Sequence, residues 1–401
     1  MAQQCFSKSF TRQEPIPEHA IERAISVLRS GKLHRYNVEV GEAGEVSELE
    51  TEFASYIGKR YCLACASCGS AMYLALKSAG VQRGDKVLCN AYTLAPVPGA
   101  IENAGADIEL VEICEDYTID IRDLDRKAAA GNAKWLLLSH MRGHMADMDK
   151  IQRVCERHGL FLIEDCAHTM GAEWDGRKSG SFGQVSCFST QTYKHMNSGE
   201  GGFLVTDDEE LMARAILHSG SYMLYDRHVA RPDLEVFDPI KKRIPNYSCR
   251  MDNLRAAILR PQLQMLTRQC QRWNERYRLL EAAIHSIEGL WCPPRDPREN
   301  YVGSSIQFSV CHGDSESIRL FLEKCRERGV ELKWFGSPEP AGFTSAYQSW
   351  EYFGNLPDLP NTNRILKRMC DMRIPLTFTL DDCRVIAEIL RDVATDILQS
   401  D

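Results

Sequence analysis

Short apolar runs alternate with segments of helical periodicity along the first half of this chain, and this alternation limits the possible folds more than any other feature. The runs are nearly continuous in apolar residues, and they cover residues 61–66, 86–89, 108–113, 135–140 and 160–165. Strands that are apolar on both faces are typical of a parallel sheet covered by helices on both sides. We therefore predict an α/β fold with a mostly parallel central sheet, whose ligands lie outside the carboxyl ends of the strands.

The pattern changes after about residue 290, where prolines gather and a strand is flanked by helices. A long helical region over 251–286 precedes this part, and we expect Pro261 to break or kink it. We predict a large domain over residues 1–260, with an N-terminal helix and loop included. A smaller α+β domain with its linking helix is predicted over residues 261–401.

Two helix starts are predicted from local signals. Ser47 and Glu50 have the spacing of a capping box, so we expect a helix from Ser47 to Ile57. The segment that follows the second strand is expected to open a helix over residues 90–104.

Residues 161–203 combine an acidic strand end with a lysine beside a glycine-rich bend. The apolar run ends on Asp165, and His168 follows; a second apolar strand then leads to Lys194. A carboxylate can keep a pyridine nitrogen protonated, and a lysine amine can form a Schiff base with an aldehyde. Pyridoxal phosphate carries both of these partners, so we predict it as the cofactor.

The junction of the first strand with the next helix is a candidate phosphate site. Residues 67–70 form a Ser-Cys-Gly-Ser turn, and the free N–H groups of a helix start favour an anion. Alternatively, Ser70 is an ordinary N-cap serine. The net charge of −8 argues against a nucleic-acid partner, so local groups must bind any phosphate.

Three of the sixteen cysteines, Cys62, Cys65 and Cys68, have the spacing of part of a metal site. No fourth ligand lies at motif spacing, and a strand would put Cys62 and Cys65 on opposite faces. We therefore expect packed or cofactor-adjacent thiols and no metal. No run approaches the roughly 18 apolar residues of a membrane helix, and the first residues have no signal-like apolar core. We therefore expect a cytoplasmic protein with reduced cysteines and no membrane partner.

Six blocks of the chain resemble, in family order, the sugar aminotransferase (DegT/StrS) family of fold-type I pyridoxal-phosphate enzymes. The blocks are GEVSELETEFASYIGKRYCLACASCGSAMYLAL, GDKVLCNAYTLAPVPGAIENAGADIELVEI, HMRGHMADMDKI, LIEDCAHTMGA, GSFGQVSCFSTQTYKHMNSGEGGFLVTDD and NYSCRMDNLRAAILRPQL. The resemblance covers residues 16–270, and later segments show it more weakly. Six blocks in order form a specific signal, whereas any one of them would be weak.

The resemblance implies roles for individual residues. Lys194 takes the place of the Schiff-base lysine, Asp165 that of the partner of the pyridine nitrogen, and His168 that of the group beside the phenolic oxygen. The implied phosphate ligands are Gly69, Ser70, Ala71 and Ser189.

Two family positions hold other residues here. In the family an aromatic residue stacks on the cofactor ring, and the matching position here is Leu94, with Tyr92 nearby. Leucine can pack on a ring but lacks aromatic stacking. The asparagine that the family takes from the neighbouring subunit is matched by Ser248, and Asn246 lies two residues before it. The resemblance thus implies a homodimer with shared active sites, in which either residue could reach the phosphate.

The substrate side has further candidates with two open interpretations. His34, Arg35 and Tyr36 match a family loop that approaches the substrate, or they form an ordinary surface loop. Arg142 places a positive charge at the end of a predicted strand. It could bind a carboxylate or phosphate of the substrate, or it could form a structural ion pair.

The implied activity is an amino transfer in two half-reactions. The donor is an amino acid, glutamate or glutamine, and the acceptor is a ketone of a sugar, nucleotide-linked sugar or cyclitol. Three alternatives remain: a sugar dehydratase of the same family, other pyridoxal-phosphate chemistry, and a catalytically silent regulatory relative. The dehydratase branch has histidine in the lysine position, so Lys194 argues against it although His195 is adjacent.

Overall fold

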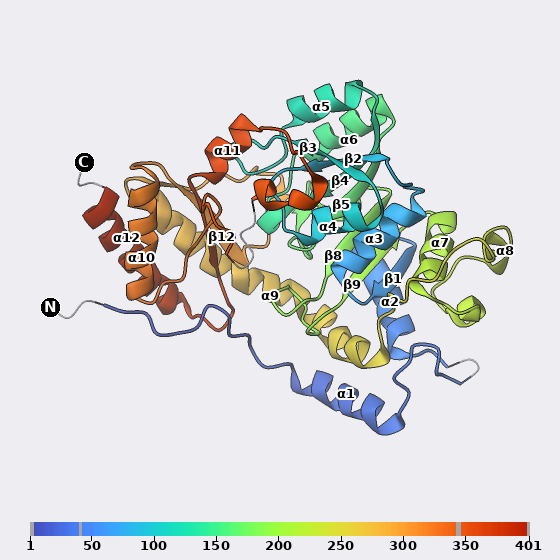
Figure 1. The fold of residues 1–401 in the computed structure, drawn as a ribbon. Coiled ribbons are helices and arrows are strands. Elements are labelled where there is room, and N and C mark those ends of the chain that lie inside the picture. The colour runs from blue at the N-terminus through green and yellow to red at the C-terminus, as the bar shows by residue number, and fades with distance from the viewer. Residues whose placement is uncertain (1–3, 40–41, 342–345, 399–401) are drawn as a thin grey trace.

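The computed structural model describes residues 4–39, 42–341 and 346–398. The strands of its central sheet are β1 Tyr61–Cys65, β2 Lys86–Asn90, β3 Asp107–Val111, β4 Ala133–Ser139, β5 Phe161–Asp165, β8 Val185–Ser189 and β9 Gly202–Thr206. They lie in the order β1-β9-β8-β5-β4-β2-β3 (Figure 1). Neighbours are parallel except at β9, which is antiparallel to β1 and β8. The predicted mostly parallel sheet is confirmed.

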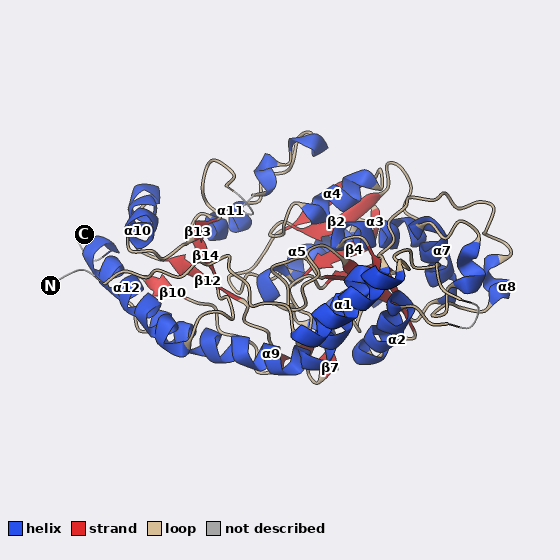
Figure 2. Cartoon of the chain, turned by 90° about the horizontal axis from the view of Figure 1, so that it is seen from below, coloured by secondary structure: helices blue, strands red, loops and turns tan. Residues whose placement is uncertain are grey.

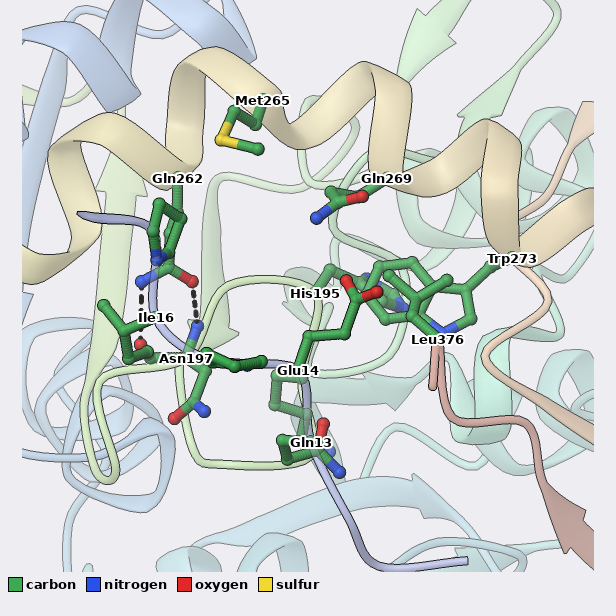
Figure 3. A pocket seen from close by; sticks show the side chains of 13 residues that line it. Gln13, Glu14, Ile16, His195, Asn197, Gln262, Met265, Gln269, Trp273 and Leu376 are labelled. Carbon is green, nitrogen blue, oxygen red and sulfur yellow. Dashed lines mark hydrogen bonds between the residues drawn. The ribbon is translucent and has the colours of Figure 1, made fainter. Parts of the chain in front are cut away.

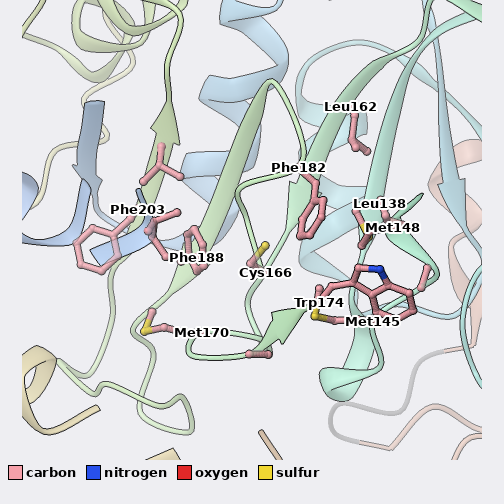
Figure 4. Packing of buried hydrophobic residues seen from close by; sticks show 14 of the residues in the cluster. Leu138, Met145, Met148, Leu162, Cys166, Met170, Trp174, Phe182, Phe188 and Phe203 are labelled. Atoms are coloured by element: carbon pink, nitrogen blue, oxygen red, sulfur yellow. The ribbon is translucent and has the colours of Figure 1, made fainter. Parts of the chain in front are cut away.

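Helices cover both faces of this sheet. One face packs against α2 Glu45–Ile57, α5 Ile121–Ala129, α6 Met148–His158 and α9 Asn253–His285, and the other against α3 Cys68–Ser78, α4 Pro96–Asn103, α7 Glu209–Ser219 and α8 Leu234–Phe237. Figure 4 shows Phe188 and Phe203 inside the first of these two cores. Cys62 packs in the first core and Cys65 in the second, as expected for residues on opposite faces of a strand.

A second sheet forms the C-terminal part. Its strands β10 Leu290–Trp291, β12 Ser305–Val310, β13 Lys333–Trp334 and β14 Met369–Arg373 are antiparallel, in the order β10-β12-β14-β13. The helices of this part are α10 Ser315–Glu327, α11 Pro360–Leu366 and α12 Leu380–Leu398. A short three-stranded sheet contains β11 Glu299–Asn300, β6 Glu173–Trp174 and β7 Arg177–Lys178. Among the described helices, none is long and apolar enough to cross a membrane.

The helix α9 connects the two parts (Figure 1). It passes through the buried Pro261 as one helix, so the expected break is wrong. Because the predicted division after residue 260 falls inside α9, the domain boundary stays a prediction. Figure 2 shows α9 beside α1 Glu18–Ser30, which packs against it.

The N-terminal segment before α1 lies against the C-terminal part. Phe6 and Phe10 meet Phe378 edge to face, with ring centroids 5.0 and 4.9 Å away. Farther along, Glu14 forms an ion pair with Arg272 of α9 at 2.6 Å. The segment thus spans from the second sheet to the middle of α9.

Both predicted helix starts are wrong. The helix α2 begins at Glu45, and the side-chain oxygen of Asn253 accepts the Val46 amide at 3.2 Å, so Ser47 lies inside the helix. The helix α4 begins only at Pro96, because Asn90 ends β2 and its side chain bonds the following loop. At α2 a tertiary contact overrides the local capping signal, whereas at α4 a local hydrogen bond of Asn90 holds the segment after β2 out of the helix.

Glu50, the second residue of the expected capping box, is buried in a charged cluster instead. Its carboxylate accepts two hydrogen bonds from Arg35, at 2.9 and 2.8 Å, and a third from the Ala64 amide at 2.7 Å. His228 lies 3.3 Å from the same carboxylate. Burial alone would raise the pKa of Glu50, but Arg35 and His228 lower it to about 2. The cluster ties the loop before α2 to the first strand.

We expect Arg35→Met to lower the free energy of unfolding by about 3–5 kcal/mol, because it leaves a buried carboxylate without its cation. Denaturant unfolding of the purified protein measures this change. The double variant Arg35→Met/Glu50→Gln should recover much of the loss, and Arg319→Leu on exposed α10 should have little effect. An Arg35→Met protein as stable as the wild type would show that the pair is not needed.

Candidate active site

A cavity of about 270 Å³ opens at the carboxyl ends of the parallel strands, as expected for this sheet. Its wall includes Asp165 at the end of β5, Ser139 at the end of β4 and Ser189 at the end of β8. The start of α3 and the segment after β8 close it. Further lining residues are Cys68, Gly69, Leu94, Met141, His168, Gln191, Lys194 and Glu200. Asp165, His168, Ser189, Gly69, Leu94 and Lys194 are therefore brought together, as the sequence predicts.

The carboxylate of Asp165 is held in one orientation. Its Oδ2 accepts a hydrogen bond from the Ser139 hydroxyl at 2.7 Å, and its Oδ1 accepts the Ala167 amide at 3.1 Å. The Cys68 thiol lies 3.9 Å from Oδ1. A buried carboxylate fixed in this way can present a constant negative charge to a cation in the cavity.

The amine of Lys194 donates a hydrogen bond to Nε2 of His168 at 2.9 Å. Burial and the nearby Arg142 lower the pKa of Lys194 to about 8, although Asp165 opposes the shift. Burial, followed by the charge of Lys194, lowers the pKa of His168 well below its usual value. The imidazole is therefore neutral near pH 7, and the lysine is close to the point where it loses its proton.

The loop that carries Lys194 is fixed to α9. The Asn197 amide donates to Oε1 of Gln262 at 2.8 Å, and Nε2 of Gln262 donates to the Asn197 carbonyl at 2.8 Å (Figure 3). A second cavity of about 70 Å³ lies on this side of the loop, between α9 and residues 13–17. His195 lines this second cavity, and its ring meets Trp273 edge to face at 5.1 Å. His195 thus does not occupy the place of Lys194 in the first cavity.

The start of α3 differs from the expected phosphate turn. The Ser67 hydroxyl accepts the Ser70 amide at 3.0 Å, so Ser67 is the N-cap. The Ala71 amide donates to the Ser67 carbonyl at 3.0 Å as the first helical hydrogen bond. The Ser70 and Ala71 amides thus already have acceptors within the chain, and their role as phosphate donors stays a prediction. Cys68 and Gly69 carry the first two amides of the helix, which have no carbonyl one turn earlier.

A glycine after Lys194 allows this helix start to lie close to the sheet. A Cβ at Gly202 would be 2.6 Å from the Cys68 amide nitrogen and 2.7 Å from the Phe188 carbonyl oxygen. Any side chain at Gly202 would therefore push α3 away from the end of β8.

Several predicted site residues lie outside the cavity. Tyr92 is buried against Phe335, with ring centroids 5.0 Å apart, so it cannot cover a ring in the cavity. Arg35 and Tyr36 are buried with Glu50 and His228, so they are not part of an ordinary surface loop, and their approach to a substrate stays a prediction. Their neighbour His34 is exposed and also does not line the cavity.

The segment predicted to serve a neighbouring subunit is exposed on this chain. The Asn246 side chain accepts the Ser248 amide at 2.9 Å, and Arg250 donates to the Ser248 hydroxyl at 3.0 Å. Ser248 has a φ of 58°, in the left-handed region. Neither Asn246 nor Ser248 lines the cavity of their own chain.

Arg142 follows β4 and is buried. Its guanidinium forms an ion pair with Asp371 of β14 at 2.9 Å. The structural ion pair considered from the sequence is therefore present, and Arg142 also lies near Lys194.

Ser139 was not predicted from the sequence as a site residue, whereas Cys68 was predicted only as part of the candidate phosphate turn. Parallel pairing places Ser139 directly beside Asp165. Ser139 could have been predicted as a site residue, because it ends a predicted parallel strand and the carboxyl ends of such strands meet at one edge of a sheet.

Comparisons with known proteins agree with the sequence resemblance. A family model described as the DegT/DnrJ/EryC1/StrS aminotransferase family matches residues 16–391. The chain is 31% identical to spore coat polysaccharide biosynthesis protein SpsC of Bacillus subtilis (strain 168) over 388 residues, which cover 94% of this chain and 95% of that protein. It is 34% identical over 223 residues to dTDP-3-amino-3,4,6-trideoxy-alpha-D-glucose transaminase of Micromonospora megalomicea subsp. nigra, with 55% of this chain and 56% of that protein covered.

A solved structure has the same fold along nearly the whole chain. The crystal structure of 3-amino-5-hydroxybenzoic acid synthase superimposes with a TM-score of 0.81 at 26% identity, covering 97% of this chain and 99% of that one.

We expect the Lys194 amine of the cofactor-free protein to react with acetylating reagents increasingly as pH rises, with half-maximal reactivity at about pH 8. Only the neutral amine is a nucleophile, and the lowered pKa makes it available at this pH. Peptide mass spectrometry after competitive labelling measures the profile, with Lys194→Ala as the control for peptide assignment. A midpoint above pH 10 would contradict the effect of burial and Arg142.

Proposed function

The chain belongs to the DegT/DnrJ/EryC1/StrS aminotransferase family, and from this premise we propose that it moves an amino group from glutamate or glutamine to a ketone of a sugar, nucleotide-linked sugar or cyclitol. It is a pyridoxal-phosphate-dependent aminotransferase. The observation that carries the proposal is the Lys194 amine, 2.9 Å from His168 in the cavity that Asp165 also lines.

The residues of the cavity fit pyridoxal phosphate. This cofactor supplies an aldehyde that bonds an amine and a protonated pyridine ring that draws electrons from the reacting carbon. Asp165 would hold the pyridine nitrogen, because Ser139 and the Ala167 amide fix its orientation. Lys194 would bond the aldehyde, and His168 would lie beside the phenolic oxygen.

The other end of the cavity has groups for the phosphate. The Cys68 and Gly69 amides at the start of α3 and the Ser189 hydroxyl are the proposed donors. Leu94 lines the cavity and is the proposed ring cover. An aliphatic side chain there excludes water, although it lacks aromatic stacking.

Lys194 is the proposed acid and base. Its neutral amine would accept the proton that leaves the donor α-carbon, and the ammonium so formed would give that proton back within the same site, while the cofactor would supply the electron-withdrawing ring. A positioned proton transfer of this kind contributes about 10²–10⁴-fold in rate. Its pKa of about 8 suits this role, because both protonation states are accessible near neutral pH. The hydrogen bond with His168 keeps the amine at the mouth of the cavity.

A homodimer with shared sites completes the proposal. Ile21, Ile25 and Leu28 are 37%, 39% and 55% exposed along one side of α1, and such an apolar row favours an interface. Asn246 and Ser248 lie on an exposed segment and would reach the phosphate of the neighbouring subunit. The His34 loop would approach the neighbouring substrate.

The division into domains and the location of the protein also remain proposals. The seven-stranded and four-stranded sheets lie in different regions of the sequence, which supports domains over residues 1–260 and 261–401, and the short third sheet joins the two regions through β11 and β6. The sixteen cysteines are free thiols, mostly buried, which supports the cytoplasm as the compartment.

Lys194→Ala should abolish both the visible absorbance of the cofactor-loaded protein and all amino transfer, because no amine is left to bond the aldehyde. Absorbance spectra with and without glutamate or glutamine measure this, and the wild type should convert to the amine form of the cofactor. A colourless wild type that takes up no added cofactor would end the enzyme proposal. A loaded wild type that responds to no amino donor would overturn the transaminase assignment.

Mixed dimers test the shared site. Lys194→Ala and Asn246→Ala/Ser248→Ala should each have low activity, and subunit exchange should restore about one quarter of wild-type activity, because half of the dimers are mixed and each has one intact site. Each variant incubated alone is the control. No recovery in exchanged dimers would count against the contribution of Asn246 and Ser248 across the interface.

A further inference from the structure

We infer that Thr93 is a positioning residue, which holds the Asp165 carboxylate in place through the hydroxyl of Ser139. Thr93 is absent from the described lining of the 270 Å³ cavity, so it would act on the cofactor only through these two residues. The inference rests on the proposed role of Asp165 as the partner of the pyridine nitrogen. It adds a residue that determines how strongly the site distinguishes a pyridine ring from a ring without that nitrogen.

Two hydroxyl groups lead to the Asp165 carboxylate. The Thr93 hydroxyl donates a hydrogen bond to the Ser139 hydroxyl at 2.7 Å, and the Ser139 hydroxyl donates to Oδ2 of Asp165 at 2.7 Å. All three residues are buried. Successive hydrogen bonds polarise one another, and a charged acceptor strengthens the bond that it receives. Removal of the Thr93 hydroxyl would therefore weaken the hydrogen bond from Ser139 to Asp165.

The side chain of Asn90 fixes the backbone on both sides of the Thr93–Ser139 hydroxyl pair. Its Oδ1 accepts the Ser139 amide at 2.9 Å, and its Nδ2 donates to the carbonyls of Ser139 and Tyr92 at 3.2 and 2.7 Å. Asn90 is itself buried, so water does not compete for these hydrogen bonds. The end of β4 and the loop that carries Thr93 are therefore held together.

The hydroxyl pair connects three neighbouring strands at their carboxyl ends. Ser139 ends β4 and Asp165 ends β5, and parallel pairing places these two residues side by side. Thr93 follows β2, which pairs with β4 on the other side. The pair therefore couples the loop after β2 to β5 across the end of β4.

Thr93 also lies beside the proposed ring cover. Leu94 directly follows it in the sequence and lines the cavity. The hydrogen-bonded groups thus begin next to the residue proposed to cover one face of the ring, and they end at the carboxylate proposed to hold its nitrogen. Both contacts with the ring would depend on the position of one short loop.

A fixed carboxylate favours the pyridine nitrogen. A carboxylate that is free to rotate loses conformational entropy when it binds a partner. Ser139 and the Ala167 amide already hold the two oxygens of Asp165, at 2.7 and 3.1 Å. Each oxygen has two lone pairs, so it can accept a further hydrogen bond from a protonated ring nitrogen. Such preorganisation increases affinity, because the ordering is complete before the ligand binds.

The test measures the affinity of the cofactor-free protein for pyridoxal phosphate and for an analogue whose ring has C–H in place of the nitrogen. Both molecules carry the aldehyde and the phosphate, but only the first offers a ring proton to Asp165. Equilibrium dialysis gives the two dissociation constants. We expect Thr93→Val and Ser139→Ala each to weaken the binding of pyridoxal phosphate by about 3- to 10-fold, through a weakened hydrogen bond to a charged group. The binding of the analogue should stay unchanged.

Further variants test whether the two hydroxyls act as one unit. Thr93→Ser keeps the hydroxyl and should keep the wild-type affinity. The double variant Thr93→Val/Ser139→Ala should bind pyridoxal phosphate as well as Ser139→Ala alone, because both hydroxyls act on the same carboxylate oxygen. Thr93→Ala removes the same hydroxyl without branching at the buried position and serves as a second variant for the same measurement.

A second pair of buried hydroxyls offers a matched control. The Ser179 hydroxyl donates to the Thr169 hydroxyl at 2.6 Å, and both residues are buried outside the described lining of the cavity. Ser179→Ala therefore removes a buried hydroxyl of the same kind without a contact to Asp165. Thermal unfolding should show a loss of stability comparable to that of Ser139→Ala, whereas the ratio of the two dissociation constants should equal that of the wild type.

An unchanged ratio of the two dissociation constants in folded Thr93→Val or Thr93→Ala would overturn the inference. A wild type that binds both molecules equally would overturn the role of Asp165 and the inference with it. Failure of the loaded wild type to transfer any amino group would instead overturn the proposed function, because the affinity ratio does not depend on the reaction.

Discussion

Parallel strand pairing at the centre of the sheet is the constraint on which the rest of this structure depends. The register places Ser139 of β4, Asp165 of β5 and Cys187 of β8 side by side. A serine hydroxyl therefore meets the Asp165 carboxylate without any specific loop geometry. The chain leaves β8 at the same edge and returns through β9, so Lys194 lines the same cavity as the carboxylate. A shift of one residue in β5 would turn Asp165 to the other face.

Burial and neighbouring charges determine the pKa of Lys194 at this edge of the sheet. Lys194 lies in a low-dielectric site with Arg142 near it, and both effects disfavour its ammonium form. Asp165 opposes these two effects, and the resulting pKa of about 8 lets the Lys194 amine lose its proton close to neutral pH. Arg142 and Arg373 both lower the pKa of Lys194, although they come from different parts of the chain.

The active site depends on both parts of the chain. The large sheet supplies residues that line the 270 Å³ cavity, and the second sheet brings Asp371 to Arg142 and Arg373 near Lys194. The helix α9 holds the Lys194 loop through Gln262 and also packs against β12. Changes far along the sequence can therefore alter the position of the lysine.

The sequence by itself determined the sheet and the cofactor, and it predicted Lys194, Asp165 and His168, which the structure brings to one cavity. These depend on local periodicity and on a motif whose residues follow one another along two adjacent strands. Only the tertiary structure decided the roles of Arg35, Tyr92 and Glu50, the true helix starts, and the approach of Arg373 to Arg142. The physical reason is that burial and ion pairing join residues far apart in the chain, as in Arg142 with Asp371, and no local pattern encodes such a contact.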